Sequence, residues 1–65
     1  MPELTRTDRE TRAEAIRVER ARRKLKQADV AELVGLNQAT IAKAEAGRAH
    51  EDTYELIESA LGLAS

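Results

Sequence analysis

The stretch that most constrains the fold of this chain is residues 27–46, QADVAELVGLNQATIAKAEA. It predicts two short helices joined by a turn at Gly35, which can adopt the positive φ that ends a helix and reverses the chain. Ala31 is small enough to let a partner helix approach closely. Ile41 lies one turn into the second helix, where an apolar side chain must point back at the first. The stretch therefore predicts a tightly packed helix pair.

The other apolar residues of this stretch complete one connected face across both helices: Val30, Val34, Leu36 and Ala44. This is the spacing of a helix-turn-helix, although any αα-hairpin with a glycine in its bend shares part of it. Because the apolar positions, the small residue and the glycine are all in register, the pattern favours a helix-turn-helix at 27–46.

Length and composition limit what the rest of the chain can form. Sixty-five residues allow one domain with a small core. Alanine and charged residues dominate, and Tyr54 is the only aromatic residue, so we expect an all-α fold of four to five short helices. The chain lacks cysteine and any run long enough to span a membrane, which favours a cytoplasmic location without membrane contact.

The formal net charge of −1 hides a strong asymmetry along the chain. Residues 1–26 have a balance of +4, residues 27–48 of −1, and residues 49–65 of −4. A basic front and an acidic back are compatible with binding DNA through one face, with the acidic end turned away from phosphate.

The first part of the chain predicts an arm followed by a long helix. Residues 1–6 show no helical periodicity and indicate a flexible arm, which leaves 7–65 as the domain. Thr7 and Glu10 have the spacing of a capping box, so the first helix is expected from Thr7 to about Lys24. Its main apolar contributions are expected from Ile16, Val18 and Ala21.

The helices after Gly35 also have recognisable starts and stops. Asn37 is a good N-cap for a helix that ends near Ala46, before Gly47. Asp52 and Glu55 form a second capping-box pattern, which predicts a last helix to about Leu61. Its core residues are expected to be Tyr54, Ile57 and Leu61. A second stripe is either core closure or a dimer seam: Leu56, Ala60 and Leu63.

With these residues placed, the chain resembles the lambda-repressor-like, Cro-type helix-turn-helix family of DNA-binding regulators. The resemblance spans roughly residues 16–63. It rests on Leu25-x-Gln27-x-x-Val30-Ala31, Gly35-Leu36-Asn37-Gln38-x-Thr40-Ile41, Glu45-x-Gly47-Arg48 and Ala60-Leu61-Gly62-Leu63. It implies a sequence-specific regulator of double-stranded DNA, of the Cro or immunity-repressor kind, with the helix at about 38–46 in the major groove.

The resemblance also implies roles for particular residues. The base-reading candidates are Asn37, Gln38, Ala39 and Lys43, with Gln38 suited to adenine. The phosphate-contacting candidates are Gln27, Thr40, Arg22, Arg23, Lys26 and Arg48. The basic run at 20–26 that supplies several of these has a simpler reading, a solvated helix end where cations suit the helix dipole. In the family, an acid at the position of Glu45 pairs with an arginine of the first helix, which implies a structural Arg20–Glu45 ion pair.

Other function classes have weaker support. The same fold could act as a protein-interaction module, such as an antitoxin-like subunit, and a homodimer through the last helix and C-terminus is a further possibility. The chain departs from the family in a longer first helix and in stopping at Ser65, where many members continue into a fifth helix. An enzyme is a distant third, because lone His50 and the acids of residues 51–58 make no catalytic or metal site. We expect no cofactor and no small-molecule ligand.

Overall fold

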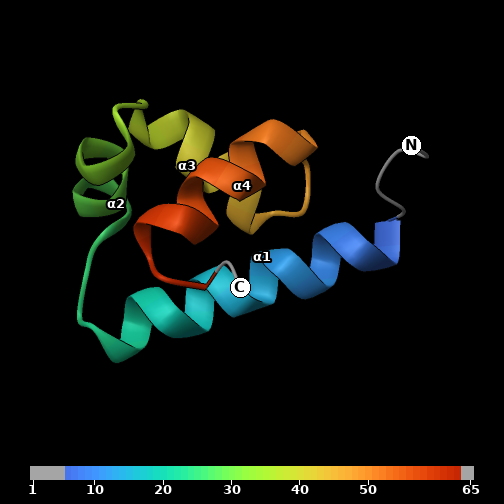
Figure 1. Cartoon of the computed structure of the whole chain (residues 1–65), viewed down its shortest axis with the longest axis horizontal. Coiled ribbons are helices and arrows are strands. Elements are labelled where there is room, and N and C mark those ends of the chain that lie inside the picture. The colour runs from blue at the N-terminus through green and yellow to red at the C-terminus, as the bar shows by residue number, and fades with distance from the viewer. Residues whose placement is uncertain (1–5, 64–65) are drawn as a thin grey trace.

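A computed structural model of the chain describes residues 6–63, and the predicted all-α fold is confirmed. The described part contains four helices: α1 (Arg6–Arg22), α2 (Gln27–Val34), α3 (Gln38–Glu45) and α4 (Glu51–Ala60). In Figure 1, α1 runs along one side of the molecule, and the three shorter helices lie together above it. None of the described helices is long and apolar enough to cross a membrane.

All four described helices end in the same kind of turn. After each, one residue takes a positive φ, between 58° and 77°, and the next residue donates its N–H to a carbonyl five residues back. This is the Schellman arrangement. Glycine occupies three of the positive-φ positions, Gly35 and Gly47 as predicted and also Gly62, but Lys24 occupies the fourth. The first helix therefore ends at Arg22 and not at Lys24.

The starts of the helices were predicted less well. Asn37 caps α3 as expected, because its side-chain oxygen accepts the Thr40 N–H at 2.8 Å. The two capping boxes were wrong. Since α1 already includes Arg6, Thr7 lies within its first turn. Helix α4 begins at Glu51, and the residue before it, His50, is its N-cap. The His50 carbonyl accepts the first helical hydrogen bonds, from the N–H groups of Thr53 and Tyr54. Asp52, the predicted cap, lies inside the helix. The arm predicted for residues 1–6 lies outside the described residues except for Arg6.

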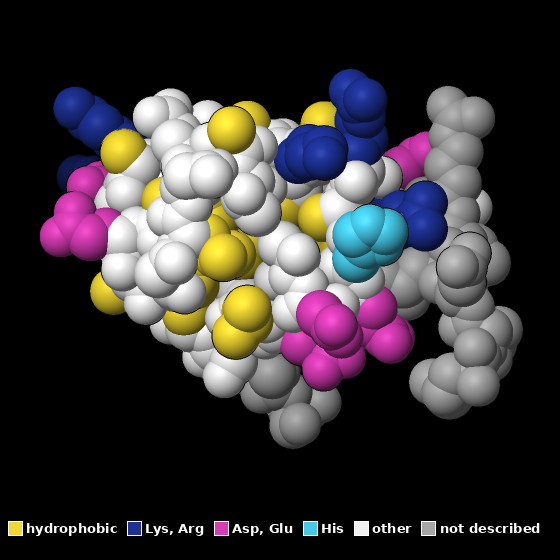
Figure 2. Space-filling model, turned by 90° about the horizontal axis from the view of Figure 1, so that it is seen from above, with side chains coloured by type: hydrophobic (Ala, Val, Ile, Leu, Met, Phe, Trp, Pro, Cys, Tyr) yellow, Lys and Arg dark blue, Asp and Glu magenta, His cyan; other side chains and the backbone are white. Residues whose placement is uncertain are grey.

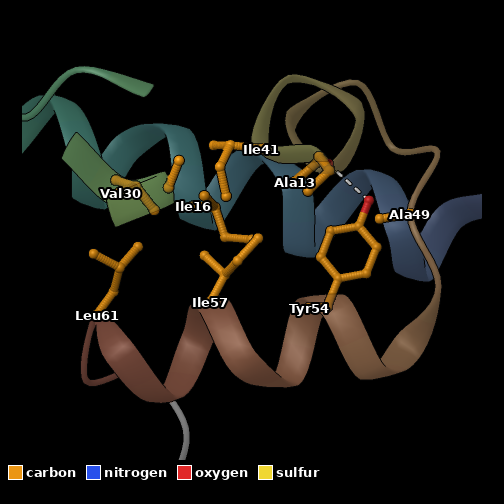
Figure 3. Packing of buried hydrophobic residues seen from close by; sticks show 10 residues of the cluster. Ala13, Ile16, Val30, Ile41, Ala49, Tyr54, Ile57 and Leu61 are labelled. Carbon is orange, nitrogen blue, oxygen red and sulfur yellow. Dashed lines mark hydrogen bonds between the residues drawn. The ribbon is translucent and has the colours of Figure 1, made fainter. Parts of the chain in front are cut away.

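A single core joins the helices. Its buried apolar residues are Ala13, Ile16, Val30, Ala31, Ile41, Ala44, Ala49, Tyr54, Ile57 and Leu61. Figure 3 shows these side chains converging from all four helices, with the Tyr54 hydroxyl donating to the Ala44 carbonyl at 2.7 Å. Tyr54 thereby satisfies its one polar atom inside the core and ties α4 to α3.

Some apolar residues lie outside this core. Val18 is 58% exposed, against our expectation, because it lies about 200° around the helix from Ile16. The stripe on α4 is also exposed: Leu56, Ala60 and Leu63. The stripe therefore does not close the core within the described residues, and the dimer seam stays a prediction.

An ion pair holds α4 against α1. The Arg12 guanidinium donates two hydrogen bonds to the Glu58 carboxylate, at 2.7 and 2.6 Å. The same guanidinium lies over the Tyr54 ring, 5.3 Å from its centroid. These hydrogen bonds from Arg12 to Glu58 raise the pKa of the Arg12 guanidinium above its ordinary value. These contacts hold α4 against α1.

Candidate nucleic-acid interface

Helix α3 has one buried side and one exposed side. Ile41 and Ala44 are fully buried, and Glu45 is only 6% exposed. The exposed residues lie on the opposite side: Gln38, Ala39, Ala42 and Lys43. Three of the four predicted base-reading residues therefore share the exposed surface of α3. The core contacts beneath this surface prevent the helix from rotating about its axis.

Asn37, the fourth predicted base-reading residue, caps α3, and this leaves fewer of its side-chain groups free to bind a base. Its side-chain oxygen accepts hydrogen bonds from both the backbone N–H and the hydroxyl of Thr40, at 2.8 and 2.9 Å. Only its amide N–H groups are left for a ligand. The Thr40 hydroxyl, a predicted phosphate contact, donates its proton within the protein and retains acceptor capacity only.

Helices α2 and α3 meet closely at their N-terminal ends. The Gln38 amide nitrogen lies 3.5 Å from the Gln27 amide oxygen, which is long for a hydrogen bond. The Gln27 amide nitrogen in turn donates to the Glu45 carboxylate at 3.2 Å. The structure therefore brings a predicted phosphate-contacting residue beside a predicted base-reading residue.

The ion pair implied for Arg20 and Glu45 is present in the structure. Arg20 donates to both carboxylate oxygens of Glu45, at 2.6 and 3.0 Å, and to the Leu25 carbonyl at 2.9 Å. The Glu45 side chain is 5% exposed, so its charge is almost fully removed from water. Because Arg20 is in α1, this pair fixes the end of α3 against the first helix.

A comparison with protein families agrees with this geometry. Residues 9–63 match the family model described as a helix-turn-helix domain. The chain belongs to the helix-turn-helix domain family. Neither the curated proteins nor the solved structures include a significant match to this chain. Within the helix-turn-helix domain, α2 and α3 are the two helices of the motif, and Gly35 forms its turn.

The basic residues predicted to contact DNA divide into two groups. Lys26, Lys43 and Arg48 are exposed, and no described residue forms an ion pair with them. Arg22 and Arg23 are both paired with Glu19, at 2.5 and 2.6 Å. These two bonds lower the pKa of Glu19 below its ordinary value.

Arg23 is also oriented away from the motif. Its guanidinium donates to the carbonyl of Leu61, just past the end of α4. The hydrogen bonds of the described residues therefore connect Gln27, Gln38, Glu45 and Arg20, but place Arg22 and Arg23 in a separate cluster around Glu19. Proximity in sequence had suggested one continuous basic patch.

Acidic residues lie at the edge of the exposed surface. Figure 2 shows the single histidine with basic side chains on one side of it and a group of acidic side chains on the other. The histidine is His50, and the next two residues are Glu51 and Asp52 at the start of α4. The charge asymmetry of the sequence is therefore also an asymmetry in space, with the acidic end beginning where α4 does.

Two contributors to this region were missed from the sequence. Arg17 donates to the backbone carbonyl of Glu45, beside the Arg20 contact. Its position one turn before Arg20 on the same helix was the available signal. Asp29 accepts the backbone N–H of Lys26 at 2.8 Å, which compensates for the poor capping residue that begins α2.

Proposed function

We propose that this protein is a sequence-specific regulator of double-stranded DNA, of the Cro or immunity-repressor kind, that inserts α3 into the major groove. The observation that carries the proposal is the exposed surface of α3, which offers amide and ammonium groups while its other side is held in the core. A helix fixed in this way can present side chains to base edges without rearranging on binding.

The base contacts follow from the chemistry of the exposed side chains. The Gln38 amide can accept from the adenine 6-amino group and donate to N7. Ala39 can contact the methyl group of thymine. Lys43 donates only, as does Asn37 once its oxygen is used for capping, so both suit guanine or phosphate oxygens.

Phosphate contacts are assigned to cations that form no ion pair with any residue in the described range 6–63. Lys26 and Arg48 are exposed beside the motif. Gln27 has a second amide N–H beyond the one bonded to Glu45. The Thr40 hydroxyl must give up its hydrogen bond to Asn37 before it can donate to a phosphate oxygen. Arg22 and Arg23 contribute less in this proposal, since Glu19 offsets their charge.

Selection of bound duplexes from a random DNA pool, followed by a salt titration, tests the proposal. Gln38→Ala should lower affinity for the selected site by roughly 1–3 kcal/mol and leave binding to random duplex nearly unchanged. Arg48→Ala should weaken both and reduce the salt dependence by about one counterion. Arg22→Ala, an exposed arginine in the separate cluster, is the matched control and should alter the salt dependence less.

A different result would point away from DNA. Binding that is absent at low salt, or that does not depend on salt, would contradict the proposal. Equal losses for selected and random duplex in Gln38→Ala would show that Gln38 positions the protein without reading sequence.

A second candidate is a protein-interaction role, with a partner or a second copy of the chain on the outer stripe of α4. The exposed Leu56 and Leu63, at 51% and 36%, favour it. Sedimentation of the protein with and without the selected duplex would show whether a second copy of the chain binds this stripe, and whether it does so only on DNA. A palindromic selected site would indicate a dimer on DNA, and an asymmetric one a monomer.

A further inference from the structure

A chain of polar side-chain contacts joins the buried Glu45 to the exposed Gln38, and its last link is the longest. Arg20 donates to both oxygens of the Glu45 carboxylate, Gln27 donates to one of them at 3.2 Å, and the Gln38 nitrogen faces the Gln27 oxygen at 3.5 Å. The chain starts at a carboxylate that is 5% exposed and ends at the first residue of α3.

The direction of this chain follows from the chemistry of its buried end. A glutamine amide has a donor end and an acceptor end, and it can usually be turned either way. A carboxylate paired with a guanidinium only accepts hydrogen bonds. Gln27 must therefore direct its nitrogen to Glu45 and its oxygen to Gln38. Gln38 must then direct its nitrogen to Gln27.

The free groups of Gln38 are thereby determined. One N–H of its amide is directed to Gln27, which leaves the second N–H and the carbonyl oxygen for a ligand. One donor and one acceptor match the N7 and 6-amino group of adenine. Guanine presents two acceptors, O6 and N7, at the same edge. To satisfy both, the Gln38 amide would have to turn over and place its oxygen against the oxygen of Gln27.

We propose that Glu45, although it cannot reach DNA, is a specificity-determining residue that acts through Gln27 to make Gln38 select adenine over guanine. The inference rests on the DNA-binding function proposed above. It makes Glu45 and Gln27 positioning residues, because each acts on the base only through the next side chain. A role for Gln27 in phosphate binding alone would change affinity without changing the choice of base.

The deciding variant is Gln27→Met, which keeps an unbranched side chain of similar length and removes both amide groups. The base pair read by Gln38 is found as the position at which Gln38→Ala loses selectivity in the random-pool selection. Dissociation constants are then measured for duplexes with adenine or guanine at that position. The unaltered protein should prefer adenine, and Gln27→Met should reduce the preference by about tenfold.

Two further variants separate positioning from other effects. Glu45→Gln offers Gln27 a donor as well as an acceptor, so it should also reduce the preference, with circular dichroism used to check that it folds. Lys26→Met is the matched control, an exposed polar residue beside Gln27 that takes no part in the chain. It should weaken binding to both duplexes and leave their ratio unchanged.

The outcomes distinguish this inference from the function on which it rests. If the unaltered protein selects no sequence, the proposed function fails, and this inference fails with it. If it binds specifically but Gln27→Met retains the same adenine-to-guanine ratio, or if the unaltered protein prefers guanine, only the inference is overturned. If folded Glu45→Gln retains the ratio while Gln27→Met loses it, the role of Glu45 is overturned.

Discussion

Two arginines of α1 hold the remaining helices by nearly the same chemistry. Arg20 forms a forked pair with Glu45 of α3, and Arg12 forms a forked pair with Glu58 of α4. The two arginine side chains are almost equally exposed, at 23% for Arg20 and 22% for Arg12. The carboxylates differ, since Glu45 is 5% exposed and Glu58 is 16% exposed.

The surroundings of the two pairs differ more than the pairs themselves. Glu45 also accepts from Gln27, and its backbone carbonyl accepts from Arg17, so the pair joins α1, α2 and α3. Arg12 instead lies over the Tyr54 ring, and its pair joins only α1 and α4. One pair is thus connected to the exposed surface of α3, and the other anchors the acidic helix away from it. Similar geometry therefore supports two different tasks.

The largest effect is expected from Arg20→Ala. Removing the guanidinium leaves the Glu45 charge buried without its partner, which should cost about 3–5 kcal/mol of unfolding free energy. The free energy of unfolding of a domain of this size is roughly 3–10 kcal/mol in total, so the variant should be largely unfolded. Urea denaturation followed by circular dichroism measures the change.

Two companion variants sharpen this first prediction. Arg22→Ala removes an arginine that is 69% exposed and whose partner retains Arg23, so its melting temperature should remain close to that of the unaltered protein. The double variant Arg20→Met/Glu45→Met should recover much of the stability, because no buried charge remains. Equal melting temperatures for Arg20→Ala and Arg22→Ala would contradict the structural role of the pair.

A smaller effect is expected from Arg12→Ala. The loss of the partly buried pair and of the contact with the Tyr54 ring should cost about 1–3 kcal/mol. Glu58 can turn toward water more readily than Glu45, which limits the loss. Binding to a selected duplex, measured on the folded fraction, should keep its base preference. A changed preference would remove the distinction between the two pairs.

The sequence predicted the features that depend on neighbouring residues better than those that depend on distant ones. The ends of α2, α3 and α4 and the cap at Asn37 were predicted, because a glycine with positive φ or a side-chain cap acts within a few residues. The start of α4 was not. It depends on where Ala49 enters the core, and this is decided by residues far away in the chain.

The basic run at 20–26 shows the same limit at the candidate interface. Arg20, Arg22 and Arg23 are close in sequence, but they are directed to Glu45, to Glu19 and to Leu61. Residues two or three positions apart on a helix face different neighbours, so composition alone could not assign them to one surface. The Arg20–Glu45 pair was implied by the family resemblance and not by the spacing of the residues.

The smallest effect is expected from the third cluster of α1, where Glu19 accepts from Arg22 and Arg23. The hydrogen bonds from Arg22, and then from Arg23, lower the pKa of Glu19 below its ordinary value of 4.5. Protonation is therefore harder in the folded than in the unfolded chain. The stabilising contribution is present above pH 4.5 and is lost as the pH falls through the folded-state pKa.

Glu19→Gln should thus be slightly less stable than the unaltered protein at pH 7, and the difference should shrink as the pH falls below 4.5. Urea midpoints measured for both proteins between neutral and acidic pH test this, with Glu14→Gln, an exposed acid of the same helix, as the control. A difference that stayed constant with pH would show that Glu19 acts through packing and not through its charge, in contrast to the buried pair at Glu45.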